Sequence, residues 1–390
     1  MAERAVDVLI VGAGGAGSAC AEALREGGYD GSVLLVGRDV DPPYDRPYCS
    51  KEYLRGELSR SDTYLEVPSD VELLTRTSVT RLDAAERTAA LSGGDEVRFG
   101  RALLAPGANV RRLRVDGCDL GGIHYLRVLG NADAIREAAA EAERVVLVGG
   151  SYIACEVAAS LTVSQGKSCT LVMEEEIPLS RGFGRAAGEF FGRVLREHGV
   201  EWVGGDPVER FEGDGERVRR VVTRSGRALE CDMVVMGTGV VPDVTLARSA
   251  GLELGDSGGI ACSASLETSA AGVWAAGDAC EYDSVIHGRR VRVEHWEVAK
   301  AHGRFAADAI RGEAGAYAEV PYFWCDLADW ASLEYVGPAD SWDREDVRGS
   351  IDDGEFAVFY MAGDRVAGAL TVGRSDDLEE AQRRMAEARR

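Results

Sequence analysis

Apolar runs of strand length that end in glycine-rich turns set the pattern of this chain. The first run, residues 8–11, leads into a turn at 12–17 and then into an alanine-rich stretch with helical character through about residue 24. A second apolar run follows at residues 32–36. Consecutive strands joined by a helix pair in parallel, because the helix carries the chain back across one face of the sheet. The N-terminal sequence therefore predicts a strand–helix–strand unit.

The same order of elements occurs a second time. Residues 145–148 form an apolar run, residues 149–154 a glycine-rich turn, and a helix through about residue 161 precedes another strand at 168–173. Two such units need parallel sheets with helices on their faces. We therefore expect two Rossmann-like dinucleotide-binding domains in one chain of the α/β class.

The remaining segments predict smaller sheets. Residues 71–104 alternate apolar and polar positions around a turn at 92–94, and residues 218–223 and 228–236 form a hairpin that leads into a strand. From residue 321 the pattern changes to short strands followed by a helix. These elements lie at residues 332–336, 347–350, 356–361, 365–372 and from 377 onward. An α+β domain is thus expected at the C-terminus.

This order of elements divides the chain into three domains. The first dinucleotide-binding domain takes residues 1–115 and 243–320, and the second is inserted at residues 116–242. The C-terminal α+β domain covers residues 321–390. A chain of 390 residues is long enough for all three.

Composition excludes several classes of protein. The net charge of −22 opposes nucleic-acid binding, which needs a basic face, and no apolar run is long enough to span a membrane. The nine cysteines include no C-x-x-C pair and the five histidines no metal-binding spacing, so we expect no metal site. Because the N-terminus lacks a secretory signal pattern, we expect a cytoplasmic protein.

The first glycine turn carries the G-x-G-x-x-G spacing in the context that this motif requires. Gly12, Gly14 and Gly17 follow a buried strand and open a helix, and Asp39 comes just beyond the second strand. Such glycines let the backbone approach a pyrophosphate, whose charge the helix N-terminus favours. An acid at that place can accept hydrogen bonds from ribose hydroxyls. The turn therefore predicts a bound dinucleotide.

The second glycine turn is less regular. Gly149 holds the first position of the motif, Ser151 the second and Ala154 the third. Alanine is compatible with the third position, but the Cβ of serine lies where a pyrophosphate comes close. Met173 occupies the place of the ribose-binding acid, and Glu174 follows it. No nearby arginine favours a 2′-phosphate, so we expect NADH rather than NADPH, with a second fold that no longer binds nucleotide as the alternative.

Two further segments identify a family resemblance. Residues 236–243 read MGTGVVPD and residues 272–280 read GVWAAGDAC. They closely resemble the two signature segments of the FAD-dependent pyridine nucleotide-disulfide oxidoreductase superfamily. The resemblance spans almost the whole chain. It implies FAD at the first glycine turn, with Asp278 on the ribityl–phosphate part of the flavin nucleotide.

Within that superfamily the sequence is most similar to ferredoxin reductases of Rieske-oxygenase and cytochrome P450 systems and to apoptosis-inducing-factor-like flavoproteins. Residues 43–51 read PYDRPYCSK, residues 153–156 IACE, residues 292–299 RVEHWEVA, and residues 321–326 PYFWCD. The resemblance implies that Arg46 meets the pyrophosphate of FAD and that Lys51, near the flavin ring, pairs with Glu156. It also implies that an aromatic side chain, Trp296, packs beside the isoalloxazine.

The resemblance also implies two sets of binding residues and a catalytic group made of Lys51, Glu156 and Trp296. The expected FAD-binding residues are Gly12, Gly14, Gly15, Ala16, Gly17, Asp39, Arg46, Lys51, Ala105, Gly107, Gly277, Asp278, His295 and Trp296. The expected NAD-binding residues are Gly149, Gly150, Ser151, Tyr152, Ile153, Glu156, Glu174, Gly237, Thr238 and Gly239.

Three positions depart from the family pattern or leave a role open. Pro106 stands where the family has threonine, which removes a hydroxyl and a backbone donor, and Cys49 replaces a leucine. Cys49 is either a redox partner of the flavin or a small buried apolar residue. His295, next to Trp296, either handles protons or only packs.

Three functions follow from the resemblance. The first is an NADH-dependent ferredoxin reductase that passes electrons from NADH through FAD to an iron–sulfur protein of an oxygenase system. The second is an NADH oxidase or substrate-transforming flavoenzyme that uses oxygen or an organic acceptor. The third is an apoptosis-inducing-factor-like protein whose redox state controls its oligomerisation. The sequence specifies neither the acceptor nor the oligomeric state.

Overall fold

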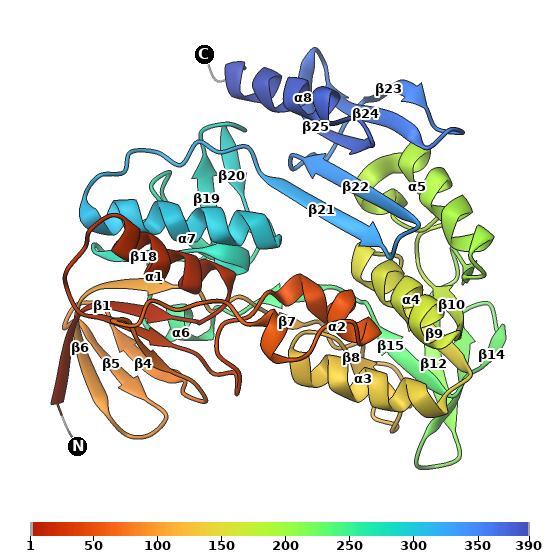
Figure 1. Cartoon of the computed structure of the whole chain (residues 1–390), viewed down its shortest axis with the longest axis horizontal. Coiled ribbons are helices and arrows are strands. Elements are labelled where there is room, and N and C mark those ends of the chain that lie inside the picture. The colour runs from red at the N-terminus through yellow and green to blue at the C-terminus, as the bar shows by residue number, and fades with distance from the viewer. Residues whose placement is uncertain (1–2, 389–390) are drawn as a thin grey trace.

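The computed structural model describes residues 3–388. Its first sheet has a parallel centre with an antiparallel hairpin at one side (Figure 1). The strands run in the order β3 (Glu72–Leu74), β2 (Val33–Val36), β1 (Glu3–Val11), β6 (Glu96–Leu104), β5 (Thr88–Leu91) and β4 (Val79–Asp83), and β18 (Val273–Ala275) also pairs with β6. β1 pairs in parallel with both β2 and β6, which confirms the first strand–helix–strand unit.

Two helices far apart in the sequence pack together on this sheet. They are α1 (Gly15–Glu26), which begins inside the first glycine turn, and α7 (Trp296–Arg311). Figure 1 shows them side by side over the strands. The helix after the first turn therefore extends two residues past the predicted end at residue 24, and Gly27 stops it.

The second sheet is entirely parallel. Its strands run in the order β11 (Glu201–Val203), β10 (Ser168–Val172), β9 (Arg144–Val148), β15 (Met233–Met236) and β8 (Ile123–Tyr125). Its helices are α3 (Leu129–Glu141), α4 (Tyr152–Gln165) and α5 (Ser180–Glu197). The second unit is thus confirmed, although α4 continues to Gln165, where Gly166 in the left-handed region ends it.

Short strands, short helices and 3₁₀ turns join the two nucleotide folds or are added to them. The chain crosses between the folds along β7 (Ala108–Val110) and β16 (Val240–Pro242), which pair with each other. The sequence pattern did not predict this pair, because three-residue strands carry too little periodicity. The other small elements are α2 (Glu52–Arg55), α6 (Thr245–Ser249), the antiparallel sheet of β12 (Val208–Gly213), β13 (Val218–Thr223) and β14 (Ala228–Glu230), the sheet of β17 (Ile260–Cys262), β19 (Cys280–Ser284) and β20 (Arg289–Val291), and the 3₁₀ turns Arg46–Ser50, Ser61–Thr63 and Gly277–Ala279.

The C-terminal residues form a five-stranded antiparallel sheet. Its order is β21 (Tyr322–Leu327), β22 (Ala331–Val336), β25 (Arg365–Val372), β24 (Glu355–Ala362) and β23 (Arg344–Ser350), and α8 (Ser375–Glu387) packs on it. Four of these strands were predicted. The first was missed, since its motif was interpreted only as a domain boundary.

The C-terminal sheet shares a hydrophobic core with the second nucleotide fold. One buried core includes side chains of α4, α5 and of β21 and β24. Within it Phe183 stacks on Phe323, and the Tyr360 hydroxyl donates to the carbonyl of Phe183. The C-terminal sheet therefore closes over the region where the two nucleotide folds meet (Figure 1). No helix among residues 3–388 combines the length and the apolar character needed to cross a membrane.

Candidate functional site

One cavity of about 800 Å³ runs between the two nucleotide folds and reaches the C-terminal sheet. Its wall includes the first glycine turn, the N-terminus of α4, the start of α7 and part of β21. The carboxyl ends of parallel strands face this space, which is where α/β proteins bind their ligands. Within the described part of the chain, no group of three or more potential metal ligands lies close together.

Different physical constraints explain the individual glycines of the first turn. Gly12 has φ of +108°, and a Cβ there would lie 2.0 Å from the carbonyl oxygen of Ala105. A Cβ at Gly17 would lie 1.9 Å from the carbonyl oxygen of Gly12. At Gly14, by contrast, the nearest atom to a Cβ would be a guanidinium nitrogen of Arg46 at 4.0 Å. Two glycines thus permit tight packing, and Gly14 leaves open space on the cavity side.

Gly15 makes room for Trp296. A Cβ at Gly15 would lie 2.7 Å from the indole ring, so the ring packs directly on the backbone of the turn. Trp296 is the first residue of α7 and lines the cavity. Its Nε1 is buried and has no hydrogen-bond partner within residues 3–388. A buried donor without a partner at a cavity wall is a feature that a bound ligand can satisfy.

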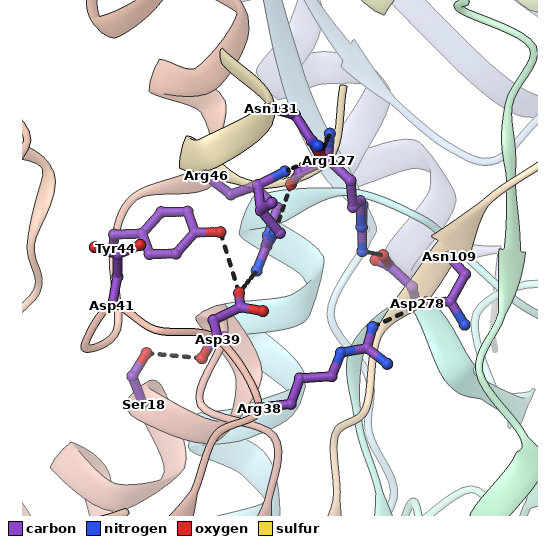
Figure 2. Close-up of polar contacts among 12 residues, drawn as sticks. Ser18, Arg38, Asp39, Asp41, Tyr44, Arg46, Asn109, Arg127, Asn131 and Asp278 are labelled. Atoms are coloured by element: carbon purple, nitrogen blue, oxygen red, sulfur yellow. Dashed lines mark hydrogen bonds and ion pairs between the residues drawn. The ribbon is translucent and has the colours of Figure 1, made fainter. Parts of the chain in front are cut away.

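A chain of polar contacts joins residues of the cavity wall, and Figure 2 shows these contacts. Asp39 accepts a hydrogen bond from the Tyr44 hydroxyl at 3.2 Å and pairs with Arg46 at 3.5 Å. Arg46 donates to the carbonyl of Arg127 at 2.5 Å, and Arg127 pairs with Asp278 at 2.7 Å. The structure therefore brings together Asp39, Arg46 and Asp278, which are far apart in the sequence.

Sequence reasoning missed two arginines of this wall. Arg127 follows β8 by two residues, and Arg38 follows β2 by two residues and binds Asp243 at 2.8 Å and Asn109 at 2.9 Å. Both stand just past the carboxyl end of a parallel strand, and that position was the only available signal. Arg38 thereby ties the segment after β2 to Asn109 in β7 and to Asp243, which directly follows β16.

Lys51 and Glu156 meet at the cavity wall as a buried ion pair. Their side chains are only 4% and 3% exposed, so this is not a surface pair. Ser50 donates its hydroxyl to Glu156 at 2.6 Å, and the ammonium lies 4.9 Å from the ring centre of Trp324. Burial alone would lower the pKa of Lys51, but the Glu156 carboxylate reverses this and the pKa is raised. The ammonium therefore stays charged in a site with little water.

Aromatic side chains close the same end of the cavity. The His295 and Phe323 rings stack with centres 3.9 Å apart, and Tyr152 packs against both. Burial lowers the pKa of His295 to about 4, so its ring is neutral at neutral pH. Burial likewise raises the pKa of Cys49 to about 12, so this thiol remains protonated. A protonated thiol and a neutral imidazole favour packing over redox and proton-handling roles.

The second glycine turn repeats the tight packing of the first. Gly149 has φ of +120°, and a Cβ there would lie 2.3 Å from the carbonyl oxygen of Gly237. The hydroxyl of Ser151 donates to the same carbonyl at 3.3 Å, which turns it toward β15. In the described chain, Gly149 and Gly150 lie behind the cavity wall. The wall itself includes Ser151, Tyr152, Ile153, Glu156, Gly237, Thr238 and Gly239.

The acidic residue beside this turn is not the one that the sequence suggested. Glu174 is exposed and Glu175 is partly buried, and neither of them lines the cavity. A Cβ at Gly150 would lie 3.3 Å from a carboxylate oxygen of Glu175 and 2.6 Å from the sulfur of Met173. Glu175 therefore faces the turn, and Arg181 pairs with it at 3.7 Å. Because residues 174–176 are all glutamate, the sequence did not indicate which of them faces the turn.

Comparison with known proteins matches the part of the chain that holds both nucleotide folds and, separately, the C-terminal domain. The family model for pyridine nucleotide-disulphide oxidoreductases matches residues 6–303, and a reductase C-terminal model matches residues 322–390. Putidaredoxin reductase of Pseudomonas putida is 33% identical over 96% of this chain and 90% of that protein. Human apoptosis-inducing factor 3 is 30% identical over 94% of this chain, which spans 60% of that longer protein.

A solved structure agrees closely with the fold. The reductase in the covalent putidaredoxin reductase–putidaredoxin complex superimposes with a TM-score of 0.92 and 32% identity, over 98% of this chain and 93% of that one. Three observations support the same family: the paired nucleotide folds, the antiparallel C-terminal sheet and the sequence matches. The chain therefore belongs to the pyridine nucleotide-disulphide oxidoreductase family, whose members are FAD- and NAD(P)-dependent oxidoreductases.

Proposed function

We propose that this protein is an NADH:ferredoxin reductase that delivers electrons to an iron–sulfur protein of an oxygenase system. The observation that carries the proposal is the buried Lys51–Glu156 pair in the wall of a cavity shared by both nucleotide folds. The similarity to putidaredoxin reductase, which has been solved in complex with putidaredoxin, supports an iron–sulfur acceptor.

The cavity has the features that FAD needs. Open space above Gly14 leaves room for a pyrophosphate against the backbone, and Arg46 lies beside it. Asp39 offers a carboxylate at the end of β2 for ribose hydroxyls, and Asp278 offers one for the ribityl chain. The partnerless Nε1 of Trp296 adds a donor at the same wall. We assign to FAD the full set of residues predicted for it, and add Arg38 and Arg127.

The chain's own residues prepare this site for electron transfer. FAD, when bound, can accept two electrons from a reduced nicotinamide and release them singly. Lys51 supplies a fixed positive charge, which Glu156 keeps protonated, and a positive charge stabilises negative charge that develops nearby. The stacked rings of His295 and Phe323 exclude water from this end of the cavity. The protein thus fixes geometry and potential and needs no nucleophile of its own.

We infer a preference for NADH over NADPH. Glu175 faces the second glycine turn where a ribose would lie, and Glu174 and Glu176 flank it in the sequence. A carboxylate there can bind ribose hydroxyls but repels a 2′-phosphate. Arg181, which the sequence did not place near this turn, is paired with Glu175 at 3.7 Å and its side chain is 78% exposed. The remaining NAD contacts proposed are those predicted from the sequence, with Glu175 in the role first given to Glu174. The domain boundaries at residues 115, 242 and 320 and the cytoplasmic location also stay predictions.

Anaerobic titration tests the proposed function. The purified flavoprotein is titrated with NADH and, separately, with NADPH, while the flavin absorbance is recorded. We expect NADH to bleach the flavin at about one equivalent, and a [2Fe–2S] ferredoxin added afterwards to restore it. No bleaching by NADH would contradict the proposal. Faster reoxidation by oxygen than by ferredoxin would instead favour the oxidase.

One alternative has a specific observation behind it. The similarity to apoptosis-inducing factor 3 extends over 94% of this chain. A redox-switched flavoprotein of that kind would form a long-lived complex with NADH and change its oligomeric state. Size-exclusion chromatography of the oxidised and the NADH-reduced protein separates the two functions, because an electron-transfer reductase keeps one elution volume.

A further inference from the structure

His302 lies in α7 directly beneath the turn that carries Asp278. The side chain is completely buried, and its Nδ1 accepts a hydrogen bond of 3.3 Å from the backbone N–H of Gly277. Gly277 has φ of +70°, in the left-handed region, so the chain bends sharply there. A buried backbone N–H without an acceptor destabilises the fold, and His302 removes that cost for this turn.

The surroundings hold the His302 ring in one state and one orientation. Burial lowers its pKa to about 3, so the imidazole is neutral. Because Nδ1 accepts a hydrogen bond, the proton is on Nε2. The rings of Tyr282 and Tyr317 stand perpendicular to the imidazole, with centres 4.9 Å and 4.7 Å away. Packing therefore fixes the acceptor against the N–H of Gly277.

The same turn is wedged between two helices. A Cβ at Gly277 would lie 3.4 Å from both Ala16 in α1 and Ala299 in α7. Gly303, next to His302, lets α7 approach so closely that a Cβ there would lie 2.1 Å from the carbonyl oxygen of Ala16. His302 thus sits where the first glycine turn, α7 and the Asp278 turn meet.

We propose that His302 is a positioning residue for the flavin site. By accepting the Gly277 N–H, it holds the turn so that the Asp278 carboxylate keeps its orientation toward Arg127 and toward the ribityl–phosphate part of FAD. It does not touch FAD, and it transfers no proton during turnover. The inference rests on the FAD site proposed above and adds to it a residue that does not line the cavity.

FAD affinity and a double-mutant cycle test this role. Apoprotein is titrated with FAD, and the quenching of flavin fluorescence is followed for wild type, H302L, H302N, D278N and the double variant H302L/D278N. We expect about tenfold weaker binding for H302L, which corresponds to about 1.4 kcal/mol. Asparagine can place an oxygen near the position of Nδ1, so H302N should bind within about twofold of wild type. The double variant should bind little more weakly than D278N alone, because His302 acts through Asp278.

A partly buried histidine elsewhere provides the matched control. His287 is also held neutral by burial, which lowers its pKa to about 4, but it is not hydrogen-bonded to the Asp278 turn. H287L should lower thermal stability and leave FAD affinity unchanged. If H302L does not fold, His302→Met replaces it in the cycle, since methionine fills similar space without a strong acceptor.

Additive effects of the His302 and Asp278 substitutions, or normal affinity in H302L, would overturn the inference alone. A wild-type apoprotein that does not bind FAD would contradict the proposed function instead. The two failures are therefore distinguishable in one set of titrations.

Discussion

Glu156, one turn into α4, neutralises Lys51, which directly follows the 3₁₀ turn Arg46–Ser50, and both side chains are almost entirely buried. A buried pair of this kind is a weak source of stability, because desolvation of the two charges offsets their attraction. Removing one partner, however, leaves an uncompensated charge. Comparison of a single substitution with a double substitution of the pair therefore distinguishes a structural role from a functional one.

Substitution of Glu156 by glutamine should therefore cost stability and activity together. We expect E156Q to lose about 3 kcal/mol of unfolding free energy, because Lys51 stays buried without its counter-charge. The double variant K51M/E156L removes both charges and should recover most of that loss. If the pair serves electron transfer, the double variant should still reduce its flavin with NADH at least about tenfold more slowly than wild type. Urea unfolding and anaerobic stopped-flow measurements check the two halves, and a double variant with wild-type reduction would show that the pair is structural only.

Filling the space above Gly14 should block the flavin nucleotide without harming the fold. A Cβ there meets no atom closer than 4.0 Å in the protein, but it takes the place proposed for the pyrophosphate. We expect G14A to unfold as an apoprotein at a temperature close to that of wild type and to bind FAD at least about tenfold more weakly. Gly130, near the N-terminus of α3, also has open space around it and lies outside the cavity wall. G130A should leave FAD binding unchanged, and equal affinities in G14A and G130A would contradict the assignment.

Neutralising Glu175 should relax the preference for NADH. Loss of one negative charge beside a 2′-phosphate is worth about 1 kcal/mol, so E175Q should improve the kcat/KM ratio of NADPH to NADH by about fivefold. The exposed neighbour Glu174 is the matched control, and E174Q should change that ratio by less than about twofold. Steady-state kinetics with both nucleotides provide the measurement. A larger effect at position 174 would restore the assignment made from sequence.

Asp45 should make stability depend on pH. Burial raises the pKa of its carboxyl to about 6, and Lys300 opposes this only in part. The folded state then holds this proton more tightly than the unfolded state, whose pKa is near 4. The stabilising contribution is therefore complete below about pH 4 and lost as the pH rises through 6. At pH 7.5 we expect D45N to be more stable than wild type by about 1 kcal/mol, because burial of the charge is avoided.

Denaturation of both proteins between pH 4 and 8 checks this prediction. The difference between wild type and D45N cancels the titration of the other carboxylates. A difference that stays constant across the range would show that Asp45 keeps its ordinary pKa in the fold.

The sequence alone determined the architecture and the identity of the nucleotide folds. Apolar strands of four or five residues followed by glycine turns carry that information locally, since a positive φ favours glycine and a closely approaching backbone requires it, as at Gly12 and Gly149. The pairing of Lys51 with Glu156 was also anticipated, but from the family resemblance and not from any local pattern.

Only the tertiary structure decided which polar residues face the cavity. Arg127 has only its position past a strand end as a local signal and His302 has none, because each side chain contacts a turn that lies far away in the sequence. Of three consecutive glutamates, the structure places Glu175 beside the second glycine turn, since the direction of a side chain past a strand end depends on the backbone path there. Periodicity specifies where strands and helices form, whereas the contacts of single polar side chains are set by how those elements pack.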